Sequence, residues 1–223
     1  DDEVLLKEKA EKLGVTSYRF IDASEKYYND CVKYLIFGNV LKNNTYPLSV
    51  SAERTIQAQT IAETALEIGA DAIAHGSTGA GNDQVRFDLI FNVMCPKIEI
   101  ITLIRDLSLS REDEIQFLKD HNNEMDFDKA KYSINKGLWG TSVGGKETLT
   151  SRYSLPEEAF PSQVEKTESS ELEIEFKNGE LISVNGETFS HPVLAIQKIE
   201  ELASPYGIGR DIHVGDTIVG IKG

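Results

Sequence analysis

The sequence predicts an α/β protein in which a doubly wound parallel sheet, residues 1–122, is followed by a smaller α+β domain, residues 123–223. In the first part, helical patterns alternate with short apolar strands, which is typical of a parallel sheet covered by helices. In the second part, the period-two pattern of strands dominates, and two Asn-Gly pairs mark hairpin turns. A glycine-rich loop follows the apolar run Ala72–Ala74, at the edge of the sheet where open α/β folds bind their ligands.

Hydrophobic periodicity and helix-end residues predict the elements of the first domain. A helix at 3–13 ends at Gly14, and Asp22 or Ser24 begins a helix that continues to about Leu41. Ser51 and Ser110 are expected N-caps, Ser110 forming a capping box with Asp113. The other expected elements are strands at 18–21, 71–74 and 98–103, helices at 51–68 and 110–121, and a helix at 83–94 that buries Val85, Ile90, Phe91, Val93 and Met94.

The second domain is expected to follow a linker that extends from Asn122 to Lys131. Apolar residues alternate with glutamates up to Phe176, Asn178-Gly179 forms a hairpin turn, and a second strand returns to Asn185-Gly186. The remaining expected elements are a helix that Pro192 opens and that continues to Leu202, and a strand at 218–221.

Composition excludes several classes of function. With 37 acidic and 23 basic residues, the formal net charge of -14 argues against nucleic acids and anionic membranes as partners. Cys31 and Cys95 lie far apart in apolar contexts, which is typical of reduced core residues, and no apolar run is long enough to span a membrane. These features predict a soluble cytoplasmic protein. The four histidines have no metal-ligand spacing, so no metal site is expected.

The loop after the apolar run is built for close approach to a ligand. Gly76, Gly79 and Gly81 leave the backbone uncovered, and we expect them to permit positive φ where the amides turn inward. Asn82 is the expected N-cap of the helix that follows, and a helix N-terminus favours anions. The G-x-x-G-x-G spacing is neither the dinucleotide fingerprint nor the Walker A loop.

The polar residues around this helix start exceed what a turn requires. They are Thr78, Asn82, Asp83, Gln84 and Arg86. An arginine can bind a carboxylate in bidentate fashion and an aspartate can bind an ammonium group, so the set suits a zwitterionic ligand. The alternative is an ordinary capped turn with a solvated helix start. His75, at the end of the strand, is either a buried, hydrogen-bonded residue or a site residue.

The string from His75 to Phe87, HGSTGAGNDQVRF, closely resembles the signature of the argininosuccinate synthase family. The resemblance implies an adenine nucleotide alpha-hydrolase-like sheet followed by a synthetase domain. It also implies an ATP site at His75, Gly76, Gly79 and Gly81 and an aspartate site at Thr78, Asn82 and Asp83. Asn82 and Arg86 would contact citrulline. The loop departs from the family at Ala80, where many members carry a lysine.

Two further pairs of residues match the family's citrulline-binding positions. Tyr46 and Ser51 have the family's spacing of five, and Ser133 and Ser142 have its spacing of nine. Without the resemblance, Tyr46 would be a surface aromatic residue beside a helix cap, and the region of Ser133 and Ser142 would be a structured loop with Trp139 at a domain interface. A citrulline-binding glutamate of the family falls on Gly215, which puts that contact in doubt.

The resemblance implies a ligase that joins citrulline to aspartate in arginine biosynthesis, with ATP and Mg²⁺ as the substrate complex and a homotetrameric assembly. The family opens with a Ser-Gly-Gly-Leu-Asp-Thr-Ser pyrophosphate loop, which does not occur in this sequence. We therefore expect a fragment that lacks the first strand and pyrophosphate loop of its first domain and the C-terminal part of its second domain. Such a fragment is expected to be inactive alone. Two alternatives remain: another adenylating ligase of the same fold, which would lack the Tyr46/Ser51 and Ser133/Ser142 pairs, and a non-catalytic nucleotide-binding module.

Overall fold

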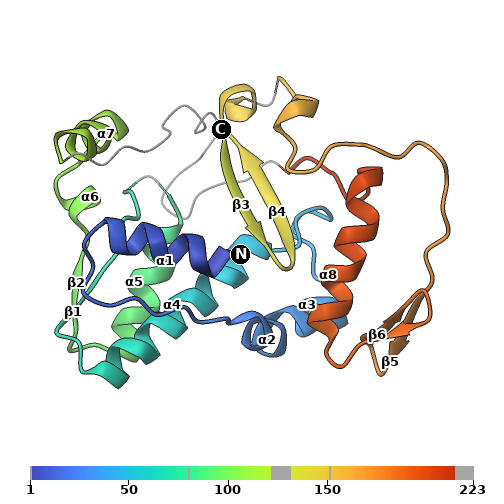
Figure 1. The fold of residues 1–223 in the computed structure, drawn as a ribbon, viewed down its shortest axis with the longest axis horizontal. Helices are drawn as coiled ribbons and strands as arrows, with labels where there is room; N and C mark the ends of the chain where they lie inside the picture. The colour runs from blue at the N-terminus through green and yellow to red at the C-terminus, as the bar shows by residue number, and fades with distance from the viewer. Residues whose placement is uncertain (1, 80, 122–131, 151, 214–223) are drawn as a thin grey trace.

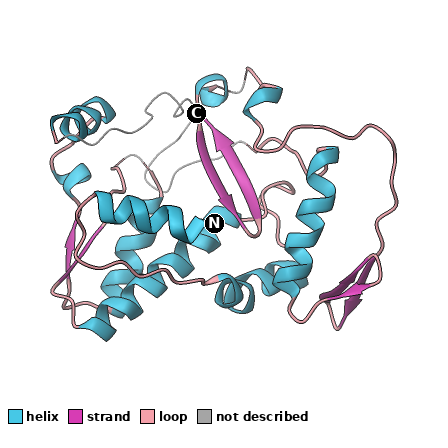
Figure 2. Ribbon diagram, in the orientation of Figure 1, coloured by secondary structure: helices cyan, strands magenta, loops and turns pink. Residues whose placement is uncertain are grey.

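The computed structural model describes residues 2–79, 81–121, 132–150 and 152–213, which form a mixed helix and strand architecture (Figure 1, Figure 2). The helices are α1 (Asp2–Lys12), α2 (Ser24–Tyr27), the π-helix η1 (Tyr28–Val32), α3 (Lys33–Phe37), α4 (Ser49–Ile68), α5 (Asp83–Met94), α6 (Leu103–Asp106), α7 (Arg111–Asp120) and α8 (Pro192–Ala203), with short 3₁₀ turns at Lys146–Leu149, Glu157–Ala159 and Ser204–Tyr206. The strands are β1 (Ala72–Ala74), β2 (Glu99–Ile101), β3 (Ser133–Gly137), β4 (Gly140–Gly144), β5 (Ile174–Lys177), β6 (Glu180–Val184) and β7 (Glu187–Thr188). No helix of the described part is long and apolar enough to cross a membrane.

Strands β1 and β2 pair in parallel and confirm the expected sheet at the base of the glycine loop. Ile73 pairs with Ile100, and the ladder extends from Ala72 opposite Glu99 to Ala74 opposite Ile101. The strand expected at 18–21 is wrong, because that segment has no strand partner among the described residues and Phe20 and Ile21 are both 44% exposed. A strand is stable only when its backbone groups are paired.

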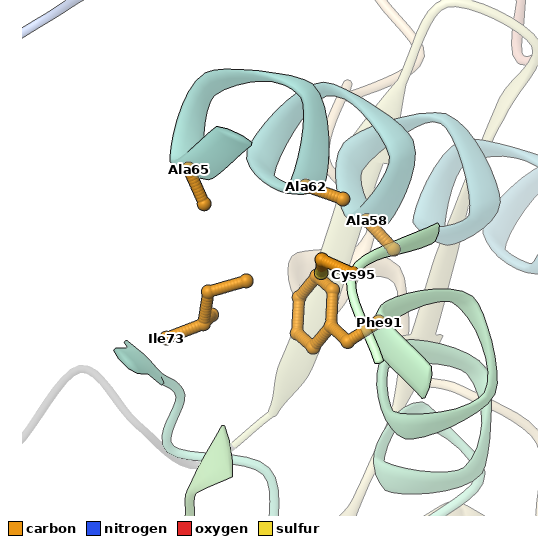
Figure 3. Close-up of a cluster of buried hydrophobic side chains, with 6 residues drawn as sticks. All are labelled: Ala58, Ala62, Ala65, Ile73, Phe91 and Cys95. Atoms are coloured by element: carbon orange, nitrogen blue, oxygen red, sulfur yellow. The ribbon is translucent and has the colours of Figure 1, made fainter. Parts of the chain in front are cut away.

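The core beside β1 is formed where α4 and α5 pack against the sheet (Figure 3). Ala58, Ala62 and Ala65 lie on one face of α4 and point toward Ile73 and Phe91, which is 1% exposed. Small residues at this spacing bring the two helices close together. Burial of Phe91 was expected from the sequence, whereas Val93 is 71% exposed, so its expected burial is wrong.

The helix expected from Ser24 to Leu41 is divided into three pieces and ends at Phe37. The π-helical turn η1 inserts one extra residue, and both Tyr27 and Tyr28 are then buried, together with Val32. These residues form a second core that Trp139 and Val193 join from the later part of the chain. Trp139 therefore packs between segments that are far apart in the sequence, and the region expected as a structured loop is the β3–β4 hairpin instead.

The later part of the chain contains two antiparallel sheets, β3 with β4 and β5 with β6 and β7. Asn178-Gly179 and Asn185-Gly186 have positive φ at all four residues, which confirms the two expected turns. Pro192 opens α8, and the His191 ring accepts a hydrogen bond from the Val193 N–H at 3.2 Å. In Figure 1 the β3–β4 hairpin stands between α8 and the α4–α5 pair, and both of its strands contact α4. The strand expected at 218–221 lies outside the described residues.

Candidate functional site

A cavity of ≈ 470 Å³ opens at the carboxyl end of β1. The strand delivers His75 and the glycine loop to this point, and the start of α5 closes the other side. The lining residues are His75, Gly76, Ser77, Thr78, Gly81, Asp83 and Phe87. Five of the residues that the resemblance assigns to ATP or aspartate are therefore in one place. The departure at Ala80 lies outside the described residues.

The sequence indicated that the loop glycines permit positive φ. Positive φ is found at eight described glycines, and Gly76 and Gly79 are not among them. A Cβ built on Gly76 would lie 3.9 Å from Ile104 Cγ1, which is an ordinary contact. The loop could therefore carry alanines without strain. The role that remains for its glycines is an uncovered backbone on the side of the ligand.

Helix α5 begins at the cavity with an ion pair. Asn82 is its N-cap residue, as expected, but its side chain makes no capping hydrogen bond. Arg86 Nη1 lies 2.8 Å from Asp83 Oδ1, so the two side chains project from the same face of the first turn. Their side chains are 20% and 37% exposed. An anionic and a cationic partner for a zwitterion are thus held together at the edge of the cavity.

Arg54, on the neighbouring helix α4, was missed in the sequence and links this ion pair to the later part of the chain. Its Nε lies 3.3 Å from Asp83 Oδ2, and its Nη2 donates to Asn135 Oδ1 at 2.7 Å. Nη1 donates to Glu53 Oε1 at 2.9 Å and to Gln57 Oε1 at 3.0 Å. An arginine three residues after Ser51 shares its helix face, and that spacing is the signal that could have identified it.

Tyr46 and Ser51 lie at the start of α4, although Ser51 does not cap the helix. The helix begins two residues earlier, with Leu48 in the left-handed conformation at the N-cap position, and the Ser51 hydroxyl donates to the Leu48 carbonyl at 3.1 Å. The Tyr46 hydroxyl instead accepts the Val50 N–H at 3.2 Å and so satisfies a free amide of the first turn. The Tyr46 ring stacks on His213 at 4.6 Å.

Ser133 and Ser142 lie on the face of the β3–β4 hairpin that meets α4. Ser142 is opposite Asn135 in the ladder, and Ser133 is two residues from Asn135, so all three share one face. Asn135 bonds to Arg54 from this face. On the same face, a Cβ on Gly137 would collide with the Glu53 carboxylate, and a Cβ on Gly140 would lie 3.5 Å from Ser49 Cβ. Glycines at these two positions therefore allow the hairpin to approach the start of α4 closely.

One carboxylate of this group is unusual. Burial raises the pKa of the Glu53 carboxyl above its ordinary value, the Arg54 guanidinium acts in the opposite direction, and the Asp83 charge adds to the rise. The Glu53 side chain is 22% exposed and lies under the hairpin. In a chain of net charge -14, Arg54 and Arg86 are thus local cations that each lie against a carboxylate.

The structure brings together three segments that carry site residues predicted from the sequence. His75, Thr78 and Asp83 line the cavity, and Arg86 is paired with Asp83. Ser133 and Ser142 share a hairpin face with Asn135, which is linked to Asp83 through Arg54, while Tyr46 and Ser51 lie at the end of α4 that carries Arg54. Gly215, the position of the family's glutamate, lies outside the described residues.

Comparison with known proteins identifies both parts of the chain. Residues 1–124 match the family described as the arginosuccinate synthase N-terminal HUP domain, and residues 132–223 match the arginosuccinate synthase C-terminal domain. The first match confirms the predicted adenine nucleotide alpha-hydrolase-like fold class, and the second confirms a synthetase domain after it.

The chain is also similar to curated argininosuccinate synthases along nearly its whole length. It is 40% identical over 220 residues to that of Methanocaldococcus jannaschii, covering 97% of this chain and 55% of the relative. It is 38% identical over 220 residues to that of Methanococcus maripaludis (96% and 55%) and 35% identical over 223 residues to that of Saccharolobus solfataricus (100% and 57%). The chain thus spans about half the length of the curated relatives it matches. On these matches, the chain belongs to the argininosuccinate synthase family.

Proposed function

We propose that the complete protein containing this chain joins L-citrulline to L-aspartate at the expense of ATP, in arginine biosynthesis. The reaction proceeds through a citrullyl-adenylate and releases AMP and pyrophosphate. Family membership supports the activity, and the names of the relatives supply the product, argininosuccinate. The domain boundary is proposed after residue 122, two residues before the end of the first family match at residue 124.

The observation that carries the proposal is the bridge formed by Arg54. One guanidinium contacts Asp83, the candidate for the aspartate amine, and Asn135, which shares a hairpin face with the citrulline candidates Ser133 and Ser142. A ligase must hold two substrates side by side, and this bridge joins the two subsites. Neither an ordinary capped turn nor an isolated hairpin would require such a connection.

Each substrate has charged ends that fit the site. Asp83 would receive the ammonium group of aspartate, with Thr78 and Asn82 as neutral partners, and Arg86 would receive the citrulline carboxylate. Asp83 and Arg86 are bonded to one another at 2.8 Å, so binding exchanges one charge partner for another and leaves neither charge unpaired. The other proposed citrulline contacts are Tyr46, Ser51, Asn82, Ser133 and Ser142.

ATP would bind along the loop, at His75, Gly76, Gly79 and Gly81. The uncovered glycine backbone allows phosphate oxygens to approach the amides at the N-terminus of α5. Magnesium would arrive with ATP as part of the substrate complex. Within the described ranges, no group of three or more His, Cys, Asp and Glu side chains could hold a metal ion.

The chemistry requires positioning rather than a protein nucleophile. The ureido oxygen of citrulline attacks the α-phosphorus of ATP, and pyrophosphate leaves. The amine of aspartate then attacks the ureido carbon, loses a proton, and displaces AMP. Holding the reacting groups in contact and matching their charges can supply most of the acceleration of such displacements. Asp83, which would hold the amine, and Arg86, which would hold citrulline, perform this positioning.

Product analysis tests the proposal. The complete protein, supplied with citrulline, aspartate and MgATP, should form argininosuccinate, AMP and pyrophosphate in equal amounts, each requiring both amino acids for full turnover. Formation of ADP and phosphate would contradict the adenylate mechanism, and AMP release with ammonia in place of aspartate would favour another adenylating ligase. We further propose a cytoplasmic homotetramer. Sedimentation equilibrium and cell fractionation test these two points.

A further inference from the structure

A partly buried hydrogen-bond network lies beneath the glycine loop, and its central residues are outside the substrate contacts proposed above. Its centre is Arg105 in α6, which begins directly after Thr102, itself next to β2. Arg105 Nη1 donates to Asp88 Oδ2 at 2.6 Å and to Gln84 Oε1 at 3.2 Å, and Nη2 donates to Thr102 Oγ1 at 3.0 Å. Thr102 is 1% exposed and Gln84 is 8% exposed. The Arg105 and Asp88 side chains are 29% and 27% exposed, so the network is only partly shielded from water.

Two arms of this network extend from Arg105 to the loop. In the first, Gln84 Nε2 donates to the Gly79 carbonyl at 2.5 Å. In the second, Asp88 Oδ1 lies 2.9 Å from His75 Nε2, and His75 Nδ1 accepts the Ser77 N–H at 3.3 Å. Because Nδ1 accepts, Nε2 carries the hydrogen that is donated to Asp88. The start of the loop, at His75, and its middle, at Gly79, are thus linked to one guanidinium through Asp88 and Gln84.

Helix α6 also lies close to the loop glycines. Cβ atoms built on Gly76 and Gly79 would lie 3.9 Å from Ile104 Cγ1 and 3.8 Å from Arg105 Cγ. These two glycines therefore have room for little more than a methyl group on the side of α6, while Gly76 and His75 also line the cavity. A change in the position of Arg105 would be transmitted to the floor of the cavity.

Stability alone does not explain a network of this kind. A buried ion pair adds little net stability over apolar side chains that fill the same space. What the network supplies is a defined conformation, because the planar guanidinium fixes the directions of three acceptors at once. A loop with three glycines has the greatest conformational freedom to lose, and an ATP site requires one arrangement of its backbone.

We propose that Arg105 is a positioning residue for adenylate formation, an inference that rests on the proposed function. It holds Gly79 through Gln84 and His75 through Asp88, so that the loop has the ATP-binding conformation before ATP arrives. Arg105 itself is not among the residues that line the cavity. Its effect should therefore appear in the use of ATP and in kcat, and not in the binding of citrulline, whose contacts come from α4, α5 and the β3–β4 hairpin.

Two variants of the complete protein test the inference. Arg105→Gln removes the guanidinium, and Arg105→Lys keeps the charge without the planar fork. We expect Arg105→Gln to lower kcat about 100-fold, as for misplaced reacting groups, and to raise the KM for ATP, with the KM for citrulline unchanged. Arg105→Lys should recover only part of kcat. The matched control is Arg19→Lys, since Arg19 is an exposed arginine that pairs with Glu67 at the far end of α4. Its kcat and KM values should equal those of the parent protein.

A measurement that does not depend on activity accompanies the kinetics. Hydrogen exchange followed by mass spectrometry should show faster exchange in the loop peptide of Arg105→Gln, with the α4–α5 core as protected as in the parent. If Arg105→Gln does not fold, Gln84→Ala removes the Gly79 arm alone and should give the same kinetic pattern. Equal kinetics or equal loop exchange in parent and variant would overturn the inference. A parent that forms no AMP and pyrophosphate from ATP, citrulline and aspartate would instead overturn the proposed function, and loop exchange would then decide the positioning role by itself.

Discussion

Arg54 Nη2 and Asn135 Oδ1 form a 2.7 Å hydrogen bond between residues that are 81 positions apart in the sequence. The same guanidinium lies 3.3 Å from Asp83 through its Nε atom. A single side chain therefore transmits the position of the β3–β4 hairpin to the first turn of α5. If the hairpin carries part of the citrulline site and α5 carries the aspartate site, the two subsites are coupled through Arg54.

A double-mutant cycle measures this coupling. Arg54→Ala and Asn135→Ala each remove one end of a charge-assisted hydrogen bond, so we expect a coupling energy of about 1–3 kcal/mol in kcat/KM for citrulline. A second cycle with Gln57→Ala, whose contact with Arg54 is exposed, should give a smaller coupling. Additive effects of Arg54→Ala and Asn135→Ala would show that the bond has no part in catalysis.

The Asp83–Arg86 pair should separate the two amino-acid substrates. Arg86→Ala should chiefly weaken the use of citrulline, and Asp83→Ala should chiefly weaken aspartate or slow the second step. Each loss should be about 2–5 kcal/mol, the usual range for one partner of a desolvated, hydrogen-bonded charge pair. Steady-state kinetics with each substrate varied in turn measures both.

The alternative hypothesis, a capped helix start with no substrate role, predicts a different result. Both variants would then have small effects of about 0.5 kcal/mol on stability and none that distinguishes the substrates. Asp120→Ala, at the exposed end of α7, serves as the control for loss of a carboxylate on a helix. Equal, minor changes toward citrulline and aspartate would contradict the proposed roles of Asp83 and Arg86.

The features that the sequence predicted well are those that local patterns determine. Positive φ at Asn178 and Gly179 follows from the turn chemistry of that pair, and α5 has the bounds that its periodicity indicated. The Ser110 capping box is present because the Ser110 and Asp113 side chains need only each other. The glycine loop was located because strand, loop and helix start are contiguous in the sequence.

Features that depend on contacts between distant segments were missed. No local pattern in the sequence indicates that Arg54 lies next to Asn135. None indicates that Arg105 lies beneath the glycine loop. The π-helical turn at Tyr28–Val32 and the early end of α3 are likewise set by tertiary packing, since local propensity favours a continuous helix there. Ser51 was assigned as a cap because its residue type suits one, but the Tyr46 hydroxyl accepts the first-turn amide instead.

A side chain at Gly137 should require the Glu53 carboxylate to move, because a Cβ there would collide with that carboxylate, which Arg54 holds in place. We expect Gly137→Ala to lower the free energy of unfolding by about 1–3 kcal/mol, the usual cost of overpacking. Gly144→Ala, in the same hairpin, is the matched control, since its Cβ would meet only Thr148 Oγ1 at 3.9 Å. Urea unfolding measures both. A second substitution, Glu53→Ala, should recover most of the loss, and equal stability of the two glycine variants would contradict the close approach.

The raised pKa of Glu53 should make stability depend on pH in a defined direction. Burial favours the protonated carboxyl in the folded protein, so the folded state holds this proton at pH values where the unfolded chain has released it. The contribution of Glu53 to stability is therefore greatest below the pKa of its carboxyl in the unfolded chain, about 4.3, and falls as the pH rises through the pKa in the folded protein.

Glu53→Gln removes this pH dependence. The free energy of unfolding of Glu53→Gln, relative to that of the parent, should therefore increase as the pH rises from 4 to 7. Urea unfolding across that range measures the difference, with Glu67→Gln, 65% exposed on the same helix, as the control. Parallel curves for the parent and Glu53→Gln would show that the carboxyl is not perturbed by its burial under the hairpin.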